Sequence, residues 1–528
     1  MDASSAANSY VLVIDLGSTS LKASIVDIKG HIQATHTEVI ETVLLPNGGA
    51  EQDAEAWWVK SRRASKKAMD DAGVQKERIL AICCDSQFSV TVPVGRDGKA
   101  LMNAVHWLDS RGAGYTQKMM NGFPKVQGLS VRKALKWIRH TGLAPIESGV
   151  DGLAHMLLIK YDYPEVYNQT YKFLEPVDFL TSRLTGQYTA SQHTAVMSVL
   201  SSNRKWGSGE YCETLVREAA IDRDKLPNLV ANDGICGTIK KEIASELGVS
   251  PETKVMNGML DNQSALIGSG IVDIGQGMIY LGTSLNINAH IARKKTDVLN
   301  SITSIPGCLP GLYMLLCEQG LGGKCLDYFL RNVLFHQDNL SDHPLPAECY
   351  DKVNEIVATI KPGSGDLLFL PWLNGTLAPR ENRWARGGFF NLSLDTTREH
   401  MLRAIMEGVA FNSKAALKPV EAFLGRKLDR IRLAGGGALS DTWAQVYADV
   451  LERPVLQLDE PHKVTCRGTG LVGFTRLGLL KVEEIPSLVK IRKTFEPISG
   501  NIPVYRKLYK QYVRIFKKNF RVFRALNS

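Results

Sequence analysis

An acid, a glycine and three hydroxyl residues interrupt the first apolar stretch of this chain. Residues 11–26 read VLVIDLGSTSLKASIV, so one strand breaks at Asp15 and a second strand begins near Ser20. Backbone N–H groups in such a turn can donate to an anion, and hydroxyls add donors. Asp15 would repel a phosphate unless a cation lay between them, and Mg²⁺ typically takes one or two carboxylates plus waters and phosphate oxygens. The stretch therefore indicates a phosphate-binding turn with a metal ligand at Asp15.

The same pattern returns almost half the chain later. Residues 281–291 read LGTSLNINAHI, which echoes LGSTSLKASIV, and each copy follows an apolar strand. A third glycine turn, at 435–437, separates a strand from a helix that Ser440 or Asp441 would begin. A single glycine turn is usually a hairpin or a helix cap. Three of them, two in repeated units, favour a nucleotide held between two similarly built α/β domains.

Two better-known phosphate motifs fit less well. The segment EQGLGGKC at 318–325 has Glu318 where a P-loop needs glycine and Cys325 after the lysine, which excludes that motif. The glycines in RGTGLVGF, from 467 to 474, satisfy GxGxxG. A dinucleotide site also needs a preceding strand and an acid about twenty residues later. The surrounding sequence instead predicts a helix whose small residues allow close packing.

A second acid stands between an apolar strand and an apolar helix. Asp261 lies in VMNGMLDNQSALIGSG, beside a glycine-rich segment at 262–275 that we take as a domain boundary. An acid in this place could accept a proton from a hydroxyl, as a general base does in phosphoryl transfer. It could equally be the N-cap of the following helix. The pattern alone leaves both open, and the glycines at 268–277 are the predicted hinge.

Further patterns predict the elements that would hold these turns. ILAICCDSQFSVTVPV at 79–94 is strand-like with a polar interruption at 85–87, and VDFLTSRLTGQY predicts a helix that ends at Gly186. Thr396 and Glu399 form a capping box before TREHMLRAIMEGVAF, whose apolar residues keep a helical period. The expected fold class is therefore α/β.

Composition limits the kinds of protein this can be. At 528 residues the chain is longer than one hydrophobic core usually supports, and its 44% hydrophobic and 22% charged residues are ordinary for globular proteins. No apolar run approaches the roughly 18 residues that span a bilayer, and MDASSAANSY lacks the features of a secretory signal. The nine cysteines show no CxxC or zinc spacing, which favours reduced thiols. We therefore expect a cytoplasmic protein of roughly two to four domains.

Most of the net charge of +9 comes from the C-terminus. Residues 506–524 contain eight lysines and arginines and no acid, which leaves +1 for the rest of the chain. Such a segment could bind nucleic acid or an anionic membrane. Its apolar residues recur at helical spacing, however, which favours a helix packed on the body of the protein. They are Tyr505, Leu508, Tyr512, Phe516, Phe520 and Phe523. We therefore expect no nucleic-acid or membrane partner.

In their order along the chain, these and further motifs resemble the FGGY family of carbohydrate kinases. They are DLGSTSLK, WLDSR at 107–111, LTGQY at 184–188, GMLDNQSALIGSG at 258–270, YLGTS at 280–284, FLPWLNGTLAP, ARGGFFNL, EGVAFN and AGGGALSDTWAQVYADVL. Together they extend over essentially the whole chain. The resemblance implies a duplicated actin-like ATPase (ribonuclease H-like) fold with an interdomain cleft. Its domains would be 1–268, on the sugar side, and 269–528, on the nucleotide side and carrying the basic terminal helix.

The resemblance also implies ATP- and Mg²⁺-dependent phosphorylation of a sugar or polyol hydroxyl. Asp261 would be the catalytic base, and Asp15 would organise the metal. The residues implied in nucleotide binding are Gly17, Ser18, Thr19, Ser20, Gly282, Thr283, Gly436, Gly437 and Ser440. Those implied in sugar binding are Gln87, Trp107, Asp109, Arg111, Asp261 and Asn262.

The sugar-side motifs depart from the family, which leaves the substrate open. Xylulokinases tend to have Met-His after the glutamine and glycerol kinases Arg-Glu, whereas this chain has Phe88-Ser89. GTLAP stands in place of the usual GER and Thr-Pro, and residues 150–165 contain no tryptophan. GGGALSDTW and WLDSR favour the pentulose branch, so we expect a xylulokinase-like enzyme for a ketopentose such as xylulose. The alternatives are ribulose, a hexulose, a tetritol or glycerol as substrate, or a non-catalytic regulatory protein with this fold, and a homodimer is left open.

Overall fold

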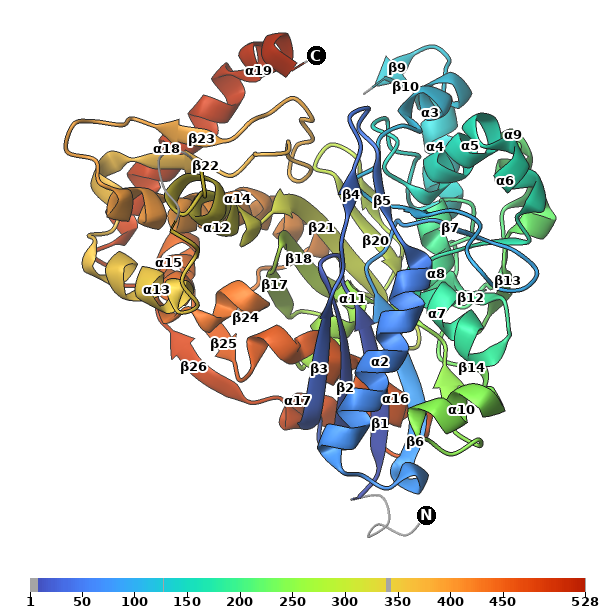
Figure 1. Ribbon diagram of the computed structural model, residues 1–528. Coiled ribbons are helices and arrows are strands. Elements are labelled where there is room, and N and C mark those ends of the chain that lie inside the picture. Colours follow the sequence, from blue (N-terminus) through green and yellow to red (C-terminus); the bar gives the residue numbers. More distant parts are fainter. Residues whose placement is uncertain (1–7, 127, 339–342, 528) are drawn as a thin grey trace.

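Two large β-sheets, one in each half of the chain, form the frame of this computed structural model (Figure 1), which describes residues 8–126, 128–338 and 343–527. The first sheet has the order β14 (Ile235–Thr238), β15 (Lys254–Met256), β6 (Ile79–Ser86), β1 (Tyr10–Leu16), β2 (Ser20–Asp27) and β3 (Ile32–Val39), with β16 (Met259–Leu260) also pairing β6. The second has the order β19 (Thr296–Asp297), β20 (Ile302–Pro306), β21 (Tyr313–Leu321), β18 (Ser284–Ile291), β17 (Gly277–Leu281), β24 (Ile431–Ala434), β25 (Val455–Leu458) and β26 (Ile491–Phe495).

The repeated sequence pattern corresponds to a repeated structure. β1 and β2 form an antiparallel hairpin, and β1 lies parallel to β6 on its other side. β17 and β18 form the second hairpin, and β17 lies parallel to β24. Each hydroxyl-rich turn therefore lies at the carboxyl end of a strand with a parallel neighbour. This confirms the expected α/β class with a duplicated frame.

Helices cover both faces of each sheet. Because side chains alternate along a strand, neighbouring strand residues pack against helices on opposite faces. In β1, Leu12 and Ile14 pack with α2 (Ala54–Ala72) and α7 (Pro176–Thr185), whereas Val11 and Val13 pack with α16 (Val464–Arg476). In the second sheet, Ile279 packs with α14 (Arg398–Leu424) and α15 (Asp441–Leu451). Its neighbour Met278 packs in the cluster that contains α11 (Asp261–Gly268).

The glycine-rich GxGxxG segment is the helix α16, as expected, and it packs closely against α11. A Cβ on Gly268 would lie 1.8 Å from the carbonyl oxygen of Val464, and a Cβ on Gly468 would lie 1.8 Å from that of Ser264. The two backbones can approach this closely only because neither glycine carries a side chain. α11 and α16 thus bring the two halves of the chain together.

Shorter elements complete the fold. A separate core around the buried Trp137 is built by α3 (Ala113–Met119), α4 (Val131–Thr141), α5 (Gly152–Asp162), α6 (Pro164–Gln169) and α9 (Glu213–Glu218). Other short helices are α8 (Gln192–Ala195), α10 (Lys241–Leu247), α12 (Lys324–Phe329), α13 (Cys349–Thr359) and α17 (Ile485–Leu488). α7 ends as predicted, with Gly186 in the left-handed conformation.

The predicted capping box of α14 was wrong by one residue. Thr397, not Thr396, is the N-cap, and its partner is His400 rather than Glu399. Thr396 is engaged elsewhere, because its Oγ1 accepts a hydrogen bond of 3.0 Å from the backbone N–H of Ser393. The preceding turn therefore shifts the start of the helix.

The basic C-terminal segment packs on the second half of the protein, as the helical spacing predicted. It forms α18 (Ile502–Lys518) and α19 (Phe520–Asn527), and Tyr505, Leu508 and Tyr512 are each at most 3% exposed. The break between the helices lies at Asn519, which the spacing did not predict. Over the described residues, no helix is both long and apolar enough to cross a membrane.

Replacing Tyr505 with phenylalanine should destabilise the second half of the protein by about 1.5–3 kcal/mol, as expected for hydrogen bonds to charged groups. The Tyr505 hydroxyl donates to Glu407 Oε1 at 2.9 Å and accepts from Arg403 Nη2 at 3.0 Å, and all three residues are buried. Urea unfolding would measure the shift in midpoint. Tyr328→Phe, at a tyrosine that is 44% exposed, is the matched control. Equal midpoints for the two variants would contradict a structural role of this buried network.

Candidate active site

Three acids meet at one edge of the first sheet. Asp15, near the end of β1, is the register partner of Asp85 in the parallel strand β6. β16 also pairs with β6, so that Leu260 lies opposite Ser86 and the next residue, Asp261, begins α11. Parallel strands place their carboxyl ends at the same sheet edge, where ligands commonly bind in open α/β sheets. The structure therefore brings the two predicted acids together, and it adds a third.

Asp15 is buried but ionised. Its Oδ2 accepts hydrogen bonds from Lys22 Nζ at 3.0 Å and from Thr465 Oγ1 at 2.7 Å. Burial alone would raise the pKa of Asp15, but the charge of Lys22 and these hydrogen bonds outweigh it and hold the pKa below the ordinary value. Lys22 is the cross-strand partner of Asp15 in the β1–β2 hairpin. It was not among the predicted site residues.

Asp85 is the acid that the sequence analysis missed. It is fully buried, and its Oδ2 accepts a hydrogen bond from Thr469 of α16. Among the described residues, its other oxygen, Oδ1, accepts no hydrogen bond. Burial and the neighbouring charge of Asp15 raise the pKa of Asp85 well above its ordinary value. The proton of Asp85 is therefore held more tightly than that of an ordinary carboxyl, because an ionised carboxylate lies beside it.

Asp261 is the first residue of α11, and not its N-cap. The cap position belongs to Leu260, which offers no side-chain hydrogen bond, while Asp261 Oδ1 accepts from the backbone N–H of Asn262 at 2.7 Å. Burial, followed by the charge of Asp15, raises the pKa of Asp261 to about 7. A carboxyl group with this pKa can release or accept a proton near neutral pH. Burial likewise raises the pKa of Glu318, on β21 near Asp261, to about 8.

The two hydroxyl-rich turns have similar backbone hydrogen bonds. Gly17 N–H donates to the carbonyl oxygen of Ser20 at 2.9 Å, and Gly282 N–H donates to that of Ser284 at 3.0 Å. The first turn, which includes Ser18 and Thr19, is longer than the second, which Gly282 and Thr283 form between β17 and β18. Both turns therefore present a short irregular backbone at a sheet edge, as an anion site requires.

The third glycine turn lies beside the second hydroxyl turn. A Cβ on Gly435 would be 3.0 Å from Gly282 N, whereas a Cβ on Gly436 would enter open space. Gly437 follows in the same 3₁₀ turn and approaches Leu281. The Ser440 hydroxyl accepts from Trp443 N–H at 3.0 Å and so caps α15, as the sequence predicted for Ser440 or Asp441.

The predicted sugar-side residues divide into two groups. Gln87 follows directly after β6, at the sheet edge where Asp15, Asp85 and Asp261 meet, which we call the acid edge. Asn262 follows Asp261, and the Oδ1 of Asn262 accepts a hydrogen bond from Asn286 Nδ2 at 3.3 Å. Trp107 Nε1 donates to Ser18 Oγ at 3.1 Å, which joins the sugar-side motif to the first turn.

Asp109 and Arg111 are bound mainly to each other. Arg111 Nη2 lies 2.6 Å from Asp109 Oδ2 and 2.7 Å from Glu51 Oε1, and Nη1 donates to the Tyr163 hydroxyl. Asp109 is fully buried and also accepts from Ala50 N–H at 2.9 Å. This pair therefore stabilises the motif internally.

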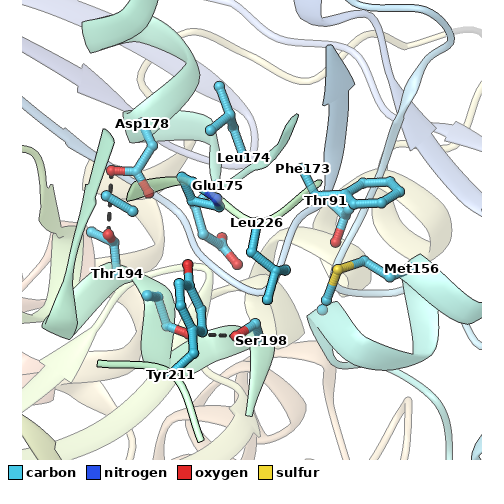
Figure 2. Close-up of a pocket in the computed structure, with 14 residues that line it drawn as sticks. Thr91, Met156, Phe173, Leu174, Glu175, Asp178, Thr194, Ser198, Tyr211 and Leu226 are labelled. Atoms are coloured by element: carbon cyan, nitrogen blue, oxygen red, sulfur yellow. Dashed lines mark hydrogen bonds between the residues drawn. The ribbon is translucent and has the colours of Figure 1, made fainter. Parts of the chain in front are cut away.

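A small cavity in the first half of the chain (Figure 2) has none of Asp15, Asp85 and Asp261 in its lining. It measures about 30 Å³, which holds roughly one water molecule. Glu175 and Asp178 line it, and Asp178 accepts a hydrogen bond from Thr194 at 3.2 Å. The cavity is too small for a nucleotide or a sugar.

Comparisons with known proteins match both halves of the chain. The model "FGGY family of carbohydrate kinases, N-terminal domain" matches residues 10–268, and the corresponding C-terminal domain model matches 277–476. Xylulose kinase of Bacillus subtilis (strain 168) is 26% identical over 522 residues, with 98% of this chain and 99% of the relative covered. Gluconokinase of the same strain is 24% identical over 508 residues, with 96% and 95% covered.

Solved structures share the fold. A gluconate kinase from Lactobacillus acidophilus superposes with a TM-score of 0.82 at 23% identity, covering 98% of this chain and 99% of that one. A ligand-bound xylulose kinase from the same organism has a TM-score of 0.81 at 24% identity, with 97% and 98% covered.

Proposed function

Because this chain belongs to the FGGY family of carbohydrate kinases, it is a sugar kinase, and we propose that it transfers the γ-phosphoryl group of ATP to a hydroxyl of a ketopentose such as xylulose. The observation that carries the proposal is the meeting of Asp15 and Asp261 at one sheet edge, with different protonation properties. Asp15 stays ionised, whereas the raised pKa of Asp261 suits a general base. We propose that Asp261 accepts the proton of the sugar hydroxyl. The proposed domains are 1–268 and 269–528.

The two turns would hold the nucleotide on either side of the acids. We propose that Gly17, Ser18, Thr19 and Ser20 bind the terminal phosphates, that Gly282 and Thr283 form the second phosphate turn, and that Gly436, Gly437 and Ser440 border the adenosine. Open space at Gly436 and the close approach of Gly435 to Gly282 N support this arrangement. Positioning and electrostatic stabilisation supply most of the catalysis in phosphoryl transfer.

The residues at the acid edge fit a magnesium ion. Asp15 is an ionised oxygen donor, and the neighbouring Asp85 Oδ1 is buried and accepts no hydrogen bond from any residue that the structure describes. Mg²⁺ prefers oxygen ligands and usually combines one or two carboxylates with phosphate oxygens and waters. Asp15 would hold the ion, which when bound would neutralise charge on the phosphates. Lys22 would keep Asp15 ionised for this purpose.

Charge at the site favours a neutral sugar over a sugar acid. Gluconate carries a carboxylate, which a binding site normally pairs with a cation. Of the described residues that we assign to the site or find beside it, Lys22 and Arg111 are the cations. Lys22 pairs with Asp15, and Arg111 pairs with Asp109 and Glu51. We therefore prefer a ketopentose, like the substrate named for the Bacillus xylulose kinase, to gluconate.

A coupled assay of ADP release tests the function. The panel contains xylulose, ribulose, gluconate, glycerol and erythritol, with ATP and Mg²⁺ present. Ketopentose-dependent ADP release that is absent from Asp261→Asn supports the proposal, and preference for gluconate would refute the charge argument. No release with any compound would favour the regulatory alternative.

Replacing Asp15 with asparagine should raise the Mg²⁺ concentration that gives the half-maximal rate at least about 10-fold. Loss of a residue that only supports a metal ligand already weakens metal binding by about this factor. Asparagine keeps the acceptor for Thr465 but removes the charge. The measurement is a Mg²⁺ titration of the initial rate at saturating sugar and ATP. Asp70→Asn, on the exposed face of α2, controls for the loss of an acid. An unchanged titration would remove Asp15 from the metal site.

A further inference from the structure

Three buried side chains form a chain of hydrogen bonds next to the proposed sugar site. His106, Gln87 and Gln52 are each at most 3% exposed. His106 Nε2 lies 3.0 Å from Gln87 Oε1, and Gln87 Nε2 donates to Gln52 Oε1 at 2.8 Å. Only Gln87 was predicted as a site residue. His106 directly precedes Trp107 and Gln52 directly follows Glu51, but neither His106 nor Gln52 has a role in the chemistry described above.

The donor and the acceptor of each hydrogen bond among His106, Gln87 and Gln52 can be assigned. The backbone N–H of Leu108 can only donate, and it lies 3.3 Å from His106 Nδ1. Burial lowers the pKa of His106 to about 3, so the ring is neutral and carries one proton. That proton must be on Nε2, which donates to Gln87 Oε1. The amide of Gln87 then has its nitrogen toward Gln52, and neither glutamine can turn over without losing a hydrogen bond.

The row of hydrogen bonds from His106 through Gln87 to Gln52 ends at the first phosphate turn. Gln52 Nε2 donates to the carbonyl oxygen of Ser18 at 2.9 Å and to Thr42 Oγ1 at 2.7 Å. The peptide group is planar and trans, so holding the Ser18 carbonyl also fixes the opposite direction of the Thr19 N–H. This N–H belongs to the turn that we assign to the phosphates. The Ser18 hydroxyl accepts from Trp107 Nε1, which leaves its own proton to donate.

We infer that His106 and Gln52 are positioning residues, which hold Gln87 in one amide orientation and thereby align the Ser18–Thr19 peptide with the nucleotide phosphates. The inference rests on the proposed function for the roles of Gln87 and of the turn. We assign no ligand contact to His106, because its two ring nitrogens pair with Gln87 Oε1 and with the N–H of Leu108. A change at His106 should therefore weaken nucleotide binding even when no sugar is present.

Calorimetric titration with Mg²⁺ and a non-hydrolysable ATP analogue, AMP-PNP, measures this directly. His106→Leu removes both hydrogen bonds of the ring and should weaken AMP-PNP binding about 5-fold, the effect of losing roughly one net buried hydrogen bond. His106→Gln places an N–H close to the position of Nε2 and should restore most of the affinity. His31→Leu, at an exposed histidine, should bind like the wild type. The melting temperature of each variant shows whether it is folded.

A double-mutant cycle tests whether His106 and Gln52 act together. Gln52→Leu should weaken binding by a similar factor, and the double variant with His106→Leu should bind no more weakly than the worse single variant. If His106→Leu does not fold, Gln52→Leu still tests the contact with Ser18. Equal AMP-PNP affinity of wild type, His106→Leu and Gln52→Leu would overturn the inference, as would additive effects.

The inference and the proposed function fail in different ways. Sugar-dependent ADP release by the wild type, together with unchanged AMP-PNP binding in the variants, overturns the positioning role alone. If the wild type does not bind AMP-PNP, the proposed function is wrong and the inference is overturned with it.

Discussion

Replacing Asp261 with asparagine should lower kcat by at least about 10²-fold, the lower range for loss of a general base. Asparagine keeps the shape of the side chain but cannot take the proton of the sugar hydroxyl. It can still accept the hydrogen bond from Asn262 N–H that Asp261 Oδ1 accepts at 2.7 Å. The fold and the start of α11 should therefore persist, and the loss should appear in turnover.

The pH profile of the wild type provides a second measurement of the same role. The pKa of Asp261 is raised to about 7, first by burial and then by the charge of Asp15. A base works in its deprotonated form, so kcat/KM should fall as the pH drops below about 7 and level off above it. The residual rate of Asp261→Asn should lack this dependence.

Two controls separate chemistry from binding and folding. Asp70→Asn removes an exposed acid from α2 and should leave the rate unchanged. AMP-PNP titration of Asp261→Asn should show a nucleotide affinity near that of the wild type, because Asp261 is assigned to the sugar. Near-normal turnover in Asp261→Asn would remove Asp261 from the role of base, whatever the substrate is.

The sequence was sufficient for features that depend on local pattern. The two hairpins follow from the echo of LGSTSLKASIV in LGTSLNINAHI, and α16 follows from a GxGxxG without a preceding strand. The two hairpins and α16 need no knowledge of which strands are neighbours. That Asp15 and Asp261 share one site was predicted from the family resemblance and not from a local pattern.

The sequence did not reveal Asp85 or Lys22, because their importance depends on strand register. Asp85 appeared only as a polar residue near the end of a strand. It becomes part of the site because β6 pairs with β1 residue for residue, opposite Asp15. Lys22 could have been found, since Leu16 pairs with Leu21 across the hairpin and the next pair outward is Asp15 with Lys22. Parallel pairing between distant segments has no comparable local signal.

Replacing Gly468 with alanine should destabilise the protein by at least about 3 kcal/mol, the upper part of the usual range for overpacking. The new Cβ would lie 1.8 Å from the carbonyl oxygen of Ser264 and 2.6 Å from the nitrogen of Gly268. Both atoms belong to the backbone of α11, so no side chain can rotate away, and the two helices must separate. Gly114→Ala is the matched control, because Gly114 also lies in a helix but a Cβ there meets nothing within 4 Å.

Separation of α16 from α11 should also reduce activity in whatever Gly468→Ala protein remains folded. α16 carries Thr465, which donates to Asp15 at 2.7 Å, and Thr469, which donates to Asp85. These threonines are one helical turn apart and face two adjacent strand ends, so a shift of the helix moves both donors away from the acids. Thermal melting and the Mg²⁺ titration of rate measure the two effects. Gly114→Ala should be neutral or stabilising by up to about 1 kcal/mol. A Gly468→Ala protein with the stability of Gly114→Ala would show that the close contact of α11 with α16 does not hold the two halves together.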